Sequence, residues 1–359
     1  MSLIVEGGRV PACWAEREKS RIASSNGAYG RFEKGVRLAL INNMPDSALE
    51  DTELQFFELL DSASGDIPVY VKLHSLTGVP RSERGRQHLE SLYFDCADLW
   101  QSRFDGAIVT GTEPKQSNLR EEPYWKQLTE VLDWAERNTS STILSCLAAH
   151  ASVLYSDNIR RHRLPDKRFG VFQSRKTSSH HLTRELPDIT RFPHSRWNEV
   201  QETDLTAAGY SVLTKSAEAG VDLFTKKKGP SLFVYFQGHP EYNAETLAKE
   251  YRRDIKRFLR GERDTYPSMP LGYFDIAAVA VLQRFQRSAV ADRREEMMAS
   301  FPNSVYKNLQ NTWHSSALGA YRNWLRYVIL NKAASSLFTT MTSSLYSADQ
   351  RKRTAPRFI

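Results

Sequence analysis

Short apolar runs alternate with longer amphipathic segments along the first half of the chain. Two segments, residues 47–62 and 124–138, place apolar side chains at helical spacing. Four apolar runs have the length of a strand, at residues 36–41, 69–73, 106–110 and 142–145. Such alternation predicts parallel β-α-β units, and strands that are apolar on both faces suit a sheet covered by helices on both sides.

The rest of the chain is richer in short β-like segments and then becomes helical. Residues 231–236 have the pattern of an apolar strand, and helical patterns follow at 243–259, 274–300 and 317–330. This order predicts the α/β class, with a mostly parallel sheet flanked by helices. We expect four parts: an N-terminal arm (1–34), an α/β domain (35–272), a helical C-terminal extension packed on that domain (273–349) and a basic tail (350–359).

Composition narrows the class of protein. The chain has 359 residues, 40% of them hydrophobic and 25% charged, and no run reaches the roughly 18 to 20 apolar residues of a membrane-spanning helix. Its first residues lack the charged start and apolar core of a signal peptide, so we expect a cytoplasmic protein that does not bind a membrane. The formal charge of +7 fits an anionic small substrate or only a basic surface, and no motif indicates a nucleic-acid partner.

One of the three cysteines stands at a chemically favourable position. Cys13, Cys96 and Cys146 are widely spaced and show neither a disulfide framework nor a metal-ligand pattern, so no bound metal is predicted. Cys146 lies where an apolar strand meets a helix, a turn that exposes its central side chain. The helix N-terminus favours the thiolate, and the backbone N–H of Leu147 could bind an oxyanion. Position alone leaves a buried structural cysteine open.

A histidine and a glutamate follow another strand. His239 and Glu241 come directly after the apolar run 231–236, at a strand end where active sites of α/β sheets gather. Because they are two residues apart, extended geometry directs their side chains to the same side. A carboxylate so placed can orient an imidazole that serves a nucleophile. A surface turn is the alternative interpretation of the same residues.

Together these pieces resemble the homoserine O-succinyltransferase family, the homoserine acyltransferases of methionine biosynthesis. The strongest match is the block 238–242, and order and approximate spacing agree from about residue 36 to residue 328. Further matching pieces are Asn43-Met44-Pro45, Val109-Thr110-Gly111, Tyr124-Trp125, Gly170-Val171, Pro193-His194-Ser195-Arg196 and Asn323-Trp324-Leu325.

The resemblance implies a fold like that of class I glutamine amidotransferases, which is flavodoxin-like, and a homodimer. It implies that Cys146 takes the acyl group from an acyl-CoA, with His239 and Glu241 as the other triad members. The acyl group then passes to the hydroxyl of homoserine in ping-pong order, without a permanently bound cofactor. The residues that fall on the family's substrate-binding positions are Lys167, Ser195 and Arg253.

Departures from the family pattern leave the substrates open. Asp46 stands where the family usually has lysine, and Leu147 stands where it commonly has tryptophan. The acyl-selecting loop holds Thr112, Glu113 and Lys115, and the lysine could pair with a succinyl carboxylate or select another donor, such as acetyl-CoA. The open alternatives are a different hydroxy amino acid such as serine, or a specialised metabolite, as acceptor; an amidotransferase-like or thioesterase-like hydrolase; and a non-catalytic binding protein.

Overall fold

The computed structural model describes residues 3–6, 14 and 35–353, with side chains as far as residue 334. Its main sheet has eight strands in the order β1-β3-β2-β4-β5-β12-β11-β8, and the first six are mutually parallel. The predicted α/β class with a mostly parallel sheet is therefore confirmed. The strands are β1 (Leu3–Val5), β2 (Val36–Ile41), β3 (Val69–His74), β4 (Gly106–Val109), β5 (Ser141–Ser145), β8 (Ser211–Val212), β11 (Leu223–Lys228) and β12 (Ser231–Phe236).

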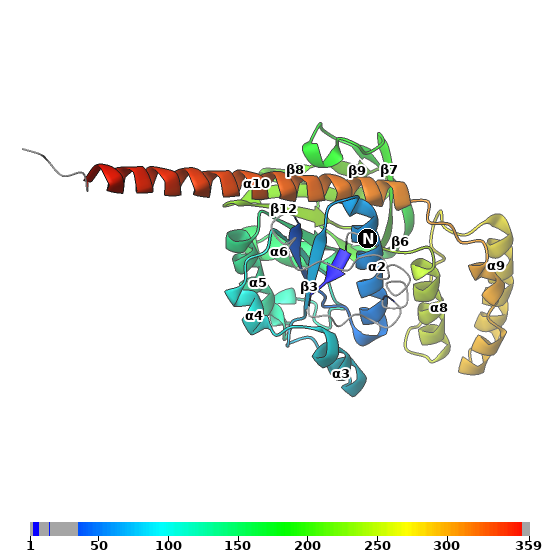
Figure 1. Ribbon diagram of the computed structural model, residues 1–359. Coiled ribbons are helices and arrows are strands. Elements are labelled where there is room, and N and C mark those ends of the chain that lie inside the picture. The colour runs from blue at the N-terminus through cyan, green and yellow to red at the C-terminus, as the bar shows by residue number, and fades with distance from the viewer. Residues whose placement is uncertain (1–2, 7–13, 15–34, 354–359) are drawn as a thin grey trace, which may run out of the picture.

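Helices cover both faces of this sheet, and each face has its own apolar core (Figure 1). Along β2, Leu38 and Leu40 enter one core while Ala39 and Ile41 enter the other, as strand alternation requires. Side chains of α2 (Asp46–Ser64), α8 (Thr246–Leu259), α9 (Ile276–Ala291) and α10 (His314–Arg353) belong to the first core. The second core holds side chains of α4 (Cys96–Gln101), α5 (Trp125–Asn138), α6 (Leu147–Asp157) and α7 (Glu202–Ala207).

The remaining helices are short. α3 (Glu83–Leu92) follows β3, and its cap Ser82 accepts a hydrogen bond from the Gly85 N–H. The 3-10 helices are η2 (Leu119–Glu121), η3 (His181–Thr183), η4 (Glu295–Ser300) and η5 (Asn303–Tyr306). None of the helices in the described part of the chain combines the length and the apolarity that crossing a membrane requires.

A second, antiparallel sheet lies beside the main one and was not foreseen as a separate unit. Its strand order is β10-β9-β6-β7, with β10 (Gly220–Val221), β9 (Thr214–Ser216), β6 (His162–Lys176) and β7 (Ile189–Glu199). β6 and β7 form a long antiparallel pair. The N–H of His239 donates to the carbonyl of Pro193 on β7 over 2.8 Å, so this sheet directly supports the chain that follows β12.

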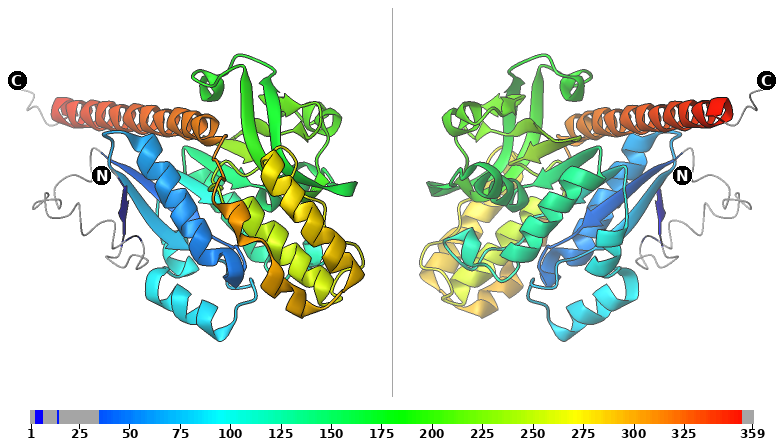
Figure 2. Two further views of the ribbon diagram at one scale, coloured as in Figure 1. Left: turned by 90° about the vertical axis from the view of Figure 1, so that its right-hand side faces the viewer. Right: turned by 90° about the vertical axis from the view of Figure 1, so that its left-hand side faces the viewer.

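The C-terminal helix is longer than the 14 residues predicted from residues 317–330, because α10 spans 40 residues. Its first part crosses the molecule, where Tyr321 and Trp324 are fully buried. Figures 1 and 2 show the helix continuing beyond the body of the molecule. Residues 350–353, expected in a basic tail, are the last turn of this helix, and 354–359 lie outside the described residues.

The N-terminal arm expected at 1–34 falls mostly outside the described residues. Within it, Leu3–Val5 is an edge strand of the main sheet, parallel to β3, and so is part of the α/β fold. Trp14 packs against Phe57 of α2 with ring centroids 5.6 Å apart. The division of the chain into four parts remains a prediction.

Candidate active site

The candidate residues gather where parallel strands end. β4, β5 and β12 are neighbours or next neighbours in the sheet and run in the same direction. Gly111 therefore follows β4, Cys146 follows β5 and His239 follows β12 at one edge of the sheet. This is the edge at which ligands bind in open α/β sheets.

Cys146 sits on a strained turn between β5 and α6. Its φ of 49° and ψ of −106° lie in a region that non-glycine residues rarely adopt. Its N–H donates to the carbonyl of Phe236 on β12 over 2.8 Å, which fixes the turn against the neighbouring strand. The thiol is half-buried, and it stands at the N-terminus of α6 as the sequence predicted.

The first turn of α6 and the loop after β4 meet beside this cysteine. A Cβ on Gly111 would lie 2.8 Å from the Cβ of Leu147 and 3.0 Å from its backbone nitrogen, so only glycine fits without a shift. The first N–H groups of a helix have no acceptor within it. The Leu147 N–H is one of these groups, and its binding of an oxyanion stays a prediction.

His239 and Glu241 form the expected pair. Nδ1 of the imidazole lies 2.9 Å from Oε1 of Glu241, and both side chains are buried. The Ser145 hydroxyl donates to the same carboxylate oxygen over 3.3 Å. Tyr242 stacks on the imidazole with ring centroids 4.3 Å apart, so the ring is held from its face as well as its edge.

The charge state of His239 follows from its neighbours. Burial lowers its pKa, but the interactions with Cys146 and with the Glu241 carboxylate outweigh burial and raise the pKa well above its ordinary value. A hydrogen bond with Cys146 contributes in the same direction. The structure therefore favours the imidazolium form of His239.

The three predicted substrate-binding residues meet around two acids that the sequence analysis left without a role. Glu250 accepts a hydrogen bond from Ser195, and Lys167 Nζ lies 3.5 Å from it. Asp254 lies 3.0 Å from Lys167 and 3.4 Å from Arg253. Burial raises the pKa of Glu250, but Lys167 and Arg253 prevail and lower it, so the Glu250 carboxylate is ionised. Glu250 and Asp254 are four residues apart on α8. This spacing places two acids on the same face of a helix, and it is the sequence signal that could have indicated the cluster.

This cluster connects directly to the candidate triad. The Tyr242 hydroxyl donates to Oε1 of Glu250 over 2.7 Å while its ring stacks on His239. The Arg253 side chain is 40% exposed, so part of its guanidinium faces outward. Substrate-binding and catalytic candidates are thus one continuous site.

Contacts at both ends fix the loop 112–116, which the sequence predicted to select the acyl group. Glu113 forms an ion pair with Arg257 of α8 over 3.2 Å, and Thr112 lies half-buried between it and Gly111. The N–H groups of Lys115 and Gln116 both donate to Oε1 of the buried Glu122 over 2.6 Å. The Lys115 side chain itself is exposed.

A buried polar layer under the site was missed by the sequence analysis. Arg196 donates to the carbonyls of Asn198 and Ala219, and its Nε lies 3.3 Å from Nδ1 of His194. Asp222 accepts the Gly238 N–H over 3.0 Å, immediately before His239. Single polar residues inside β-like segments carry no sequence signal that distinguishes them from surface positions.

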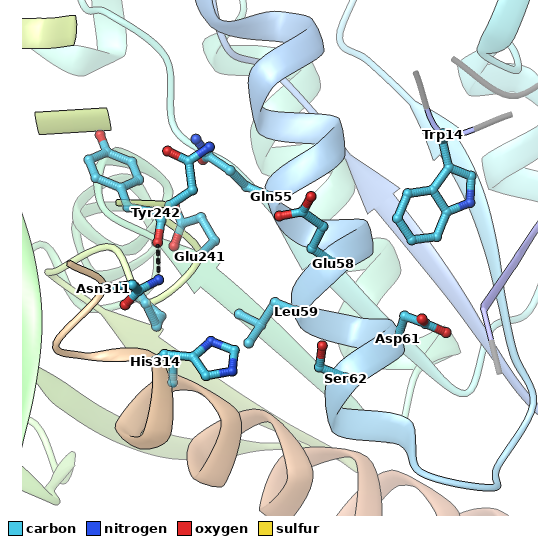
Figure 3. A pocket seen from close by; sticks show the side chains of 13 residues that line it. Trp14, Gln55, Glu58, Leu59, Asp61, Ser62, Glu241, Tyr242, Asn311 and His314 are labelled. Atoms are coloured by element: carbon cyan, nitrogen blue, oxygen red, sulfur yellow. Dashed lines mark hydrogen bonds between the residues drawn. The ribbon is translucent and has the colours of Figure 1, made fainter. Parts of the chain in front are cut away.

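A cavity of about 620 Å³ lies behind the imidazole–carboxylate pair, between α2 and the start of α10 (Figure 3). Glu241, Tyr242 and Asn311 form part of its lining, and the Asn311 amide donates to the Tyr242 carbonyl over 3.4 Å. Oε2 of Glu241 is buried without a partner among the described residues. Within those residues, no group of three or more His, Cys, Asp or Glu side chains could hold a metal ion.

A cysteine on a strained strand-to-helix turn, beside an imidazole that a carboxylate contacts, is typical of α/β enzymes that work through a covalent bond to cysteine. Comparison with known proteins narrows this class. The sequence model of the family "Homoserine O-succinyltransferase" matches residues 11–335. The chain belongs to the homoserine O-succinyltransferase family.

Individual relatives agree. A homoserine O-succinyltransferase of Rhodopseudomonas palustris is 45% identical over 81% of this chain and 87% of its own length. One of Bradyrhizobium japonicum is 42% identical over 91% of this chain and 99% of its own length. Among solved structures, a glutamine amidotransferase from Thermotoga maritima covers 82% of this chain and 98% of its own at 14% identity, with a TM-score of 0.43. That score is too low to support an argument.

Proposed function

We propose that the protein transfers the succinyl group of succinyl-CoA to the hydroxyl of L-homoserine through a thioester on Cys146. The observation that carries the proposal is the strained turn that presents Cys146 to the buried His239–Glu241 pair. The names of the relatives favour homoserine as acceptor and succinyl as acyl group over the serine, acetyl and hydrolytic alternatives.

In the first half-reaction the Cys146 thiolate attacks the thioester carbonyl of succinyl-CoA. The oxyanion that forms accepts a hydrogen bond from the Leu147 N–H, a contribution worth about 3 to 4 kcal/mol in comparable sites. The bond between the carbonyl carbon and the CoA sulfur then breaks. The imidazolium of His239 gives its proton to the leaving CoA thiolate, and Cys146 keeps the succinyl group.

In the second half-reaction the neutral His239 takes the proton of the homoserine hydroxyl, whose oxygen attacks the Cys146 thioester. The bond to the cysteine sulfur breaks, and thiolate and imidazolium are restored. Glu241 keeps the imidazole oriented in both steps. Arg253 binds the homoserine carboxylate with its outward face, while Lys167 and Ser195 complete the subsite.

The decisive experiment is intact-protein mass spectrometry after incubation with succinyl-CoA. Wild type is expected to gain the mass of one succinyl group and to lose it when homoserine is added. Cys146→Ala, which has no nucleophile at this position, should gain no mass. Cys96→Ser is the matched control, because Cys96 is buried and its thiol donates a hydrogen bond to the Ser75 carbonyl.

An adduct that still forms in Cys146→Ala would refute the role of Cys146 as the nucleophile. Discharge by serine but not homoserine would replace the acceptor, and discharge by water alone would favour the hydrolase. The homodimer and the cytoplasmic location remain predictions, which light scattering and cell fractionation would check.

A further inference from the structure

An arginine next to the acyl-selecting loop has an unused binding edge. Arg161 lies between α6 and β6, and its Nη2 donates to the carbonyls of Gln116 and Ser117 over 3.4 and 3.2 Å. Within the part of the chain that the structure describes, Nε and Nη1 have no acceptor, and no carboxylate lies within ion-pair distance of the guanidinium. The side chain is only half-exposed.

The loop that positions Arg161 is fixed beside the nucleophile. At its start, Gly111 touches Leu147, the residue after Cys146. At its far end, the Gln116 N–H donates to the Glu122 carboxylate over 2.6 Å. This hydrogen bond restrains the backbone whose carbonyls accept hydrogen bonds from Arg161. The loop therefore fixes both the guanidinium and the wall next to the thiol.

The Arg161 guanidinium also interacts electrostatically with Cys146. Burial lowers the pKa of Arg161, and the charges of Tyr124, Glu122 and Cys146 act against this effect. A partly desolvated cation without a paired carboxylate is a ready partner for an anionic ligand group.

Three other cations near the site are already engaged. Arg196 is buried and donates to two carbonyls. Lys167 is paired with Glu250 and Asp254, and Arg257 with Glu113. The Lys115 side chain, which the sequence suggested as the selecting residue, is exposed.

We propose that Arg161 binds the distal carboxylate of the acyl group carried by Cys146, and that it selects donors with a carboxylate at the end of a short chain. The proposal rests on the proposed function, because it needs the thioester on Cys146. In a succinyl thioester the distal carboxylate lies roughly 5 to 6 Å from the cysteine sulfur, given carbon–carbon bonds of about 1.5 Å. A guanidinium with a free edge can bind it with two hydrogen bonds.

The test compares succinyl-CoA with butyryl-CoA, whose chain has the same number of carbons but ends in a methyl group. CoA release in a single turnover gives the acylation efficiency with each donor. In Arg161→Gln we expect the efficiency with succinyl-CoA to fall about 10- to 100-fold, since a charge-assisted hydrogen-bonded pair is lost. Efficiency with butyryl-CoA should stay as in wild type.

Arg160→Gln is the matched control, because Arg160 is the exposed neighbour in sequence and should change neither donor. An equal loss with both donors would overturn the proposal and show that Arg161 only supports the loop. An unchanged preference would overturn it as well. If wild type forms no acyl-enzyme with any donor, the proposed function itself fails, which is a distinct result.

Discussion

At the scale of single residues, the candidate triad depends on one carboxylate with an unusual environment. Oε1 of Glu241 is hydrogen-bonded to both the His239 imidazole and the Ser145 hydroxyl, whereas Oε2 is buried without a partner among the described residues. A buried carboxylate with one unpaired oxygen is costly. We infer that the site tolerates this cost because the negative charge stabilises the imidazolium.

Replacing this charge is therefore expected to affect turnover more than substrate binding. In Glu241→Gln the amide keeps the shape but no longer stabilises the imidazolium, so kcat should fall about 100-fold or more. Steady-state kinetics with succinyl-CoA and homoserine measures the effect. Ser145→Ala, which removes only the weaker hydrogen bond, serves as the comparison, and an equal loss in both variants would contradict the role of the charge.

The buried Asp222 is expected to make the stability of the protein depend on pH. Burial raises the pKa of Asp222 from 3.8 to about 6, although the Gly238 N–H opposes the shift. The folded state thus holds this proton more tightly than the unfolded state. Stability should fall as pH rises from about 4 to 6, by up to about 3 kcal/mol, and then stay level with respect to this group.

Asp222→Asn should remove this component of the pH dependence, because its oxygen still accepts the Gly238 N–H but no longer ionises. Urea unfolding at pH 4.5 to 8, in roughly half-unit steps, measures the free energy of unfolding. Asp264→Asn changes an exposed aspartate and should leave the wild-type pH profile intact. An Asp222→Asn profile parallel to wild type would refute the assignment.

At the scale of elements, the sequence patterns located strands and helices well where one period dominates. β2 and β12 have the predicted bounds, and α5 and α6 begin within one residue of the predicted positions. The helix predicted at 47–62 begins one residue earlier, at Asp46, and its N-cap Pro45 makes no side-chain cap hydrogen bond. Asp46 instead binds Arg81 of a distant segment, a tertiary contact that local spacing cannot show.

The contact between the β4 loop and α6 gives the element-scale prediction. Gly111→Ala would force the loop and Leu147 apart by a few tenths of an ångström or more. Because that displaces the oxyanion N–H, kcat should fall about 100-fold, at a stability cost of about 1 to 3 kcal/mol.

Kinetics and urea unfolding together separate these two effects. Gly209→Ala is the control: its φ of +80° makes alanine strained, yet nothing lies within 4 Å of the added Cβ. It should therefore lose stability without losing kcat. Full activity of Gly111→Ala would contradict the oxyanion role of Leu147.

At the scale of the whole molecule, the sequence could indicate the parallel sheet and its active edge but not the partners that meet there. Cys146, His239 and Glu241 were identifiable because strand ends converge in this class of fold. The Glu250–Asp254 cluster and the position of Arg161 were not, since they depend on contacts between β6, the 112–118 loop and α8. The full length of α10 was equally hidden, because its later part lacks a continuous apolar period.

Only the first part of α10 is expected to stabilise the protein. The buried side chains of α10 found in the described residues end at Val328, and Leu330 is already 69% exposed. The Trp324 indole donates to the Ser141 hydroxyl on β5 over 2.9 Å, which joins the helix to the strand that precedes Cys146.

A chain ending at Ala334 should therefore keep its unfolding temperature within a few degrees and retain succinyl transfer. Trp324→Ala in the full chain should instead lose about 3 to 5 kcal/mol of stability, measured by urea unfolding. If the truncated chain unfolds readily while Trp324→Ala does not, the stabilising part of α10 is its far end rather than its base.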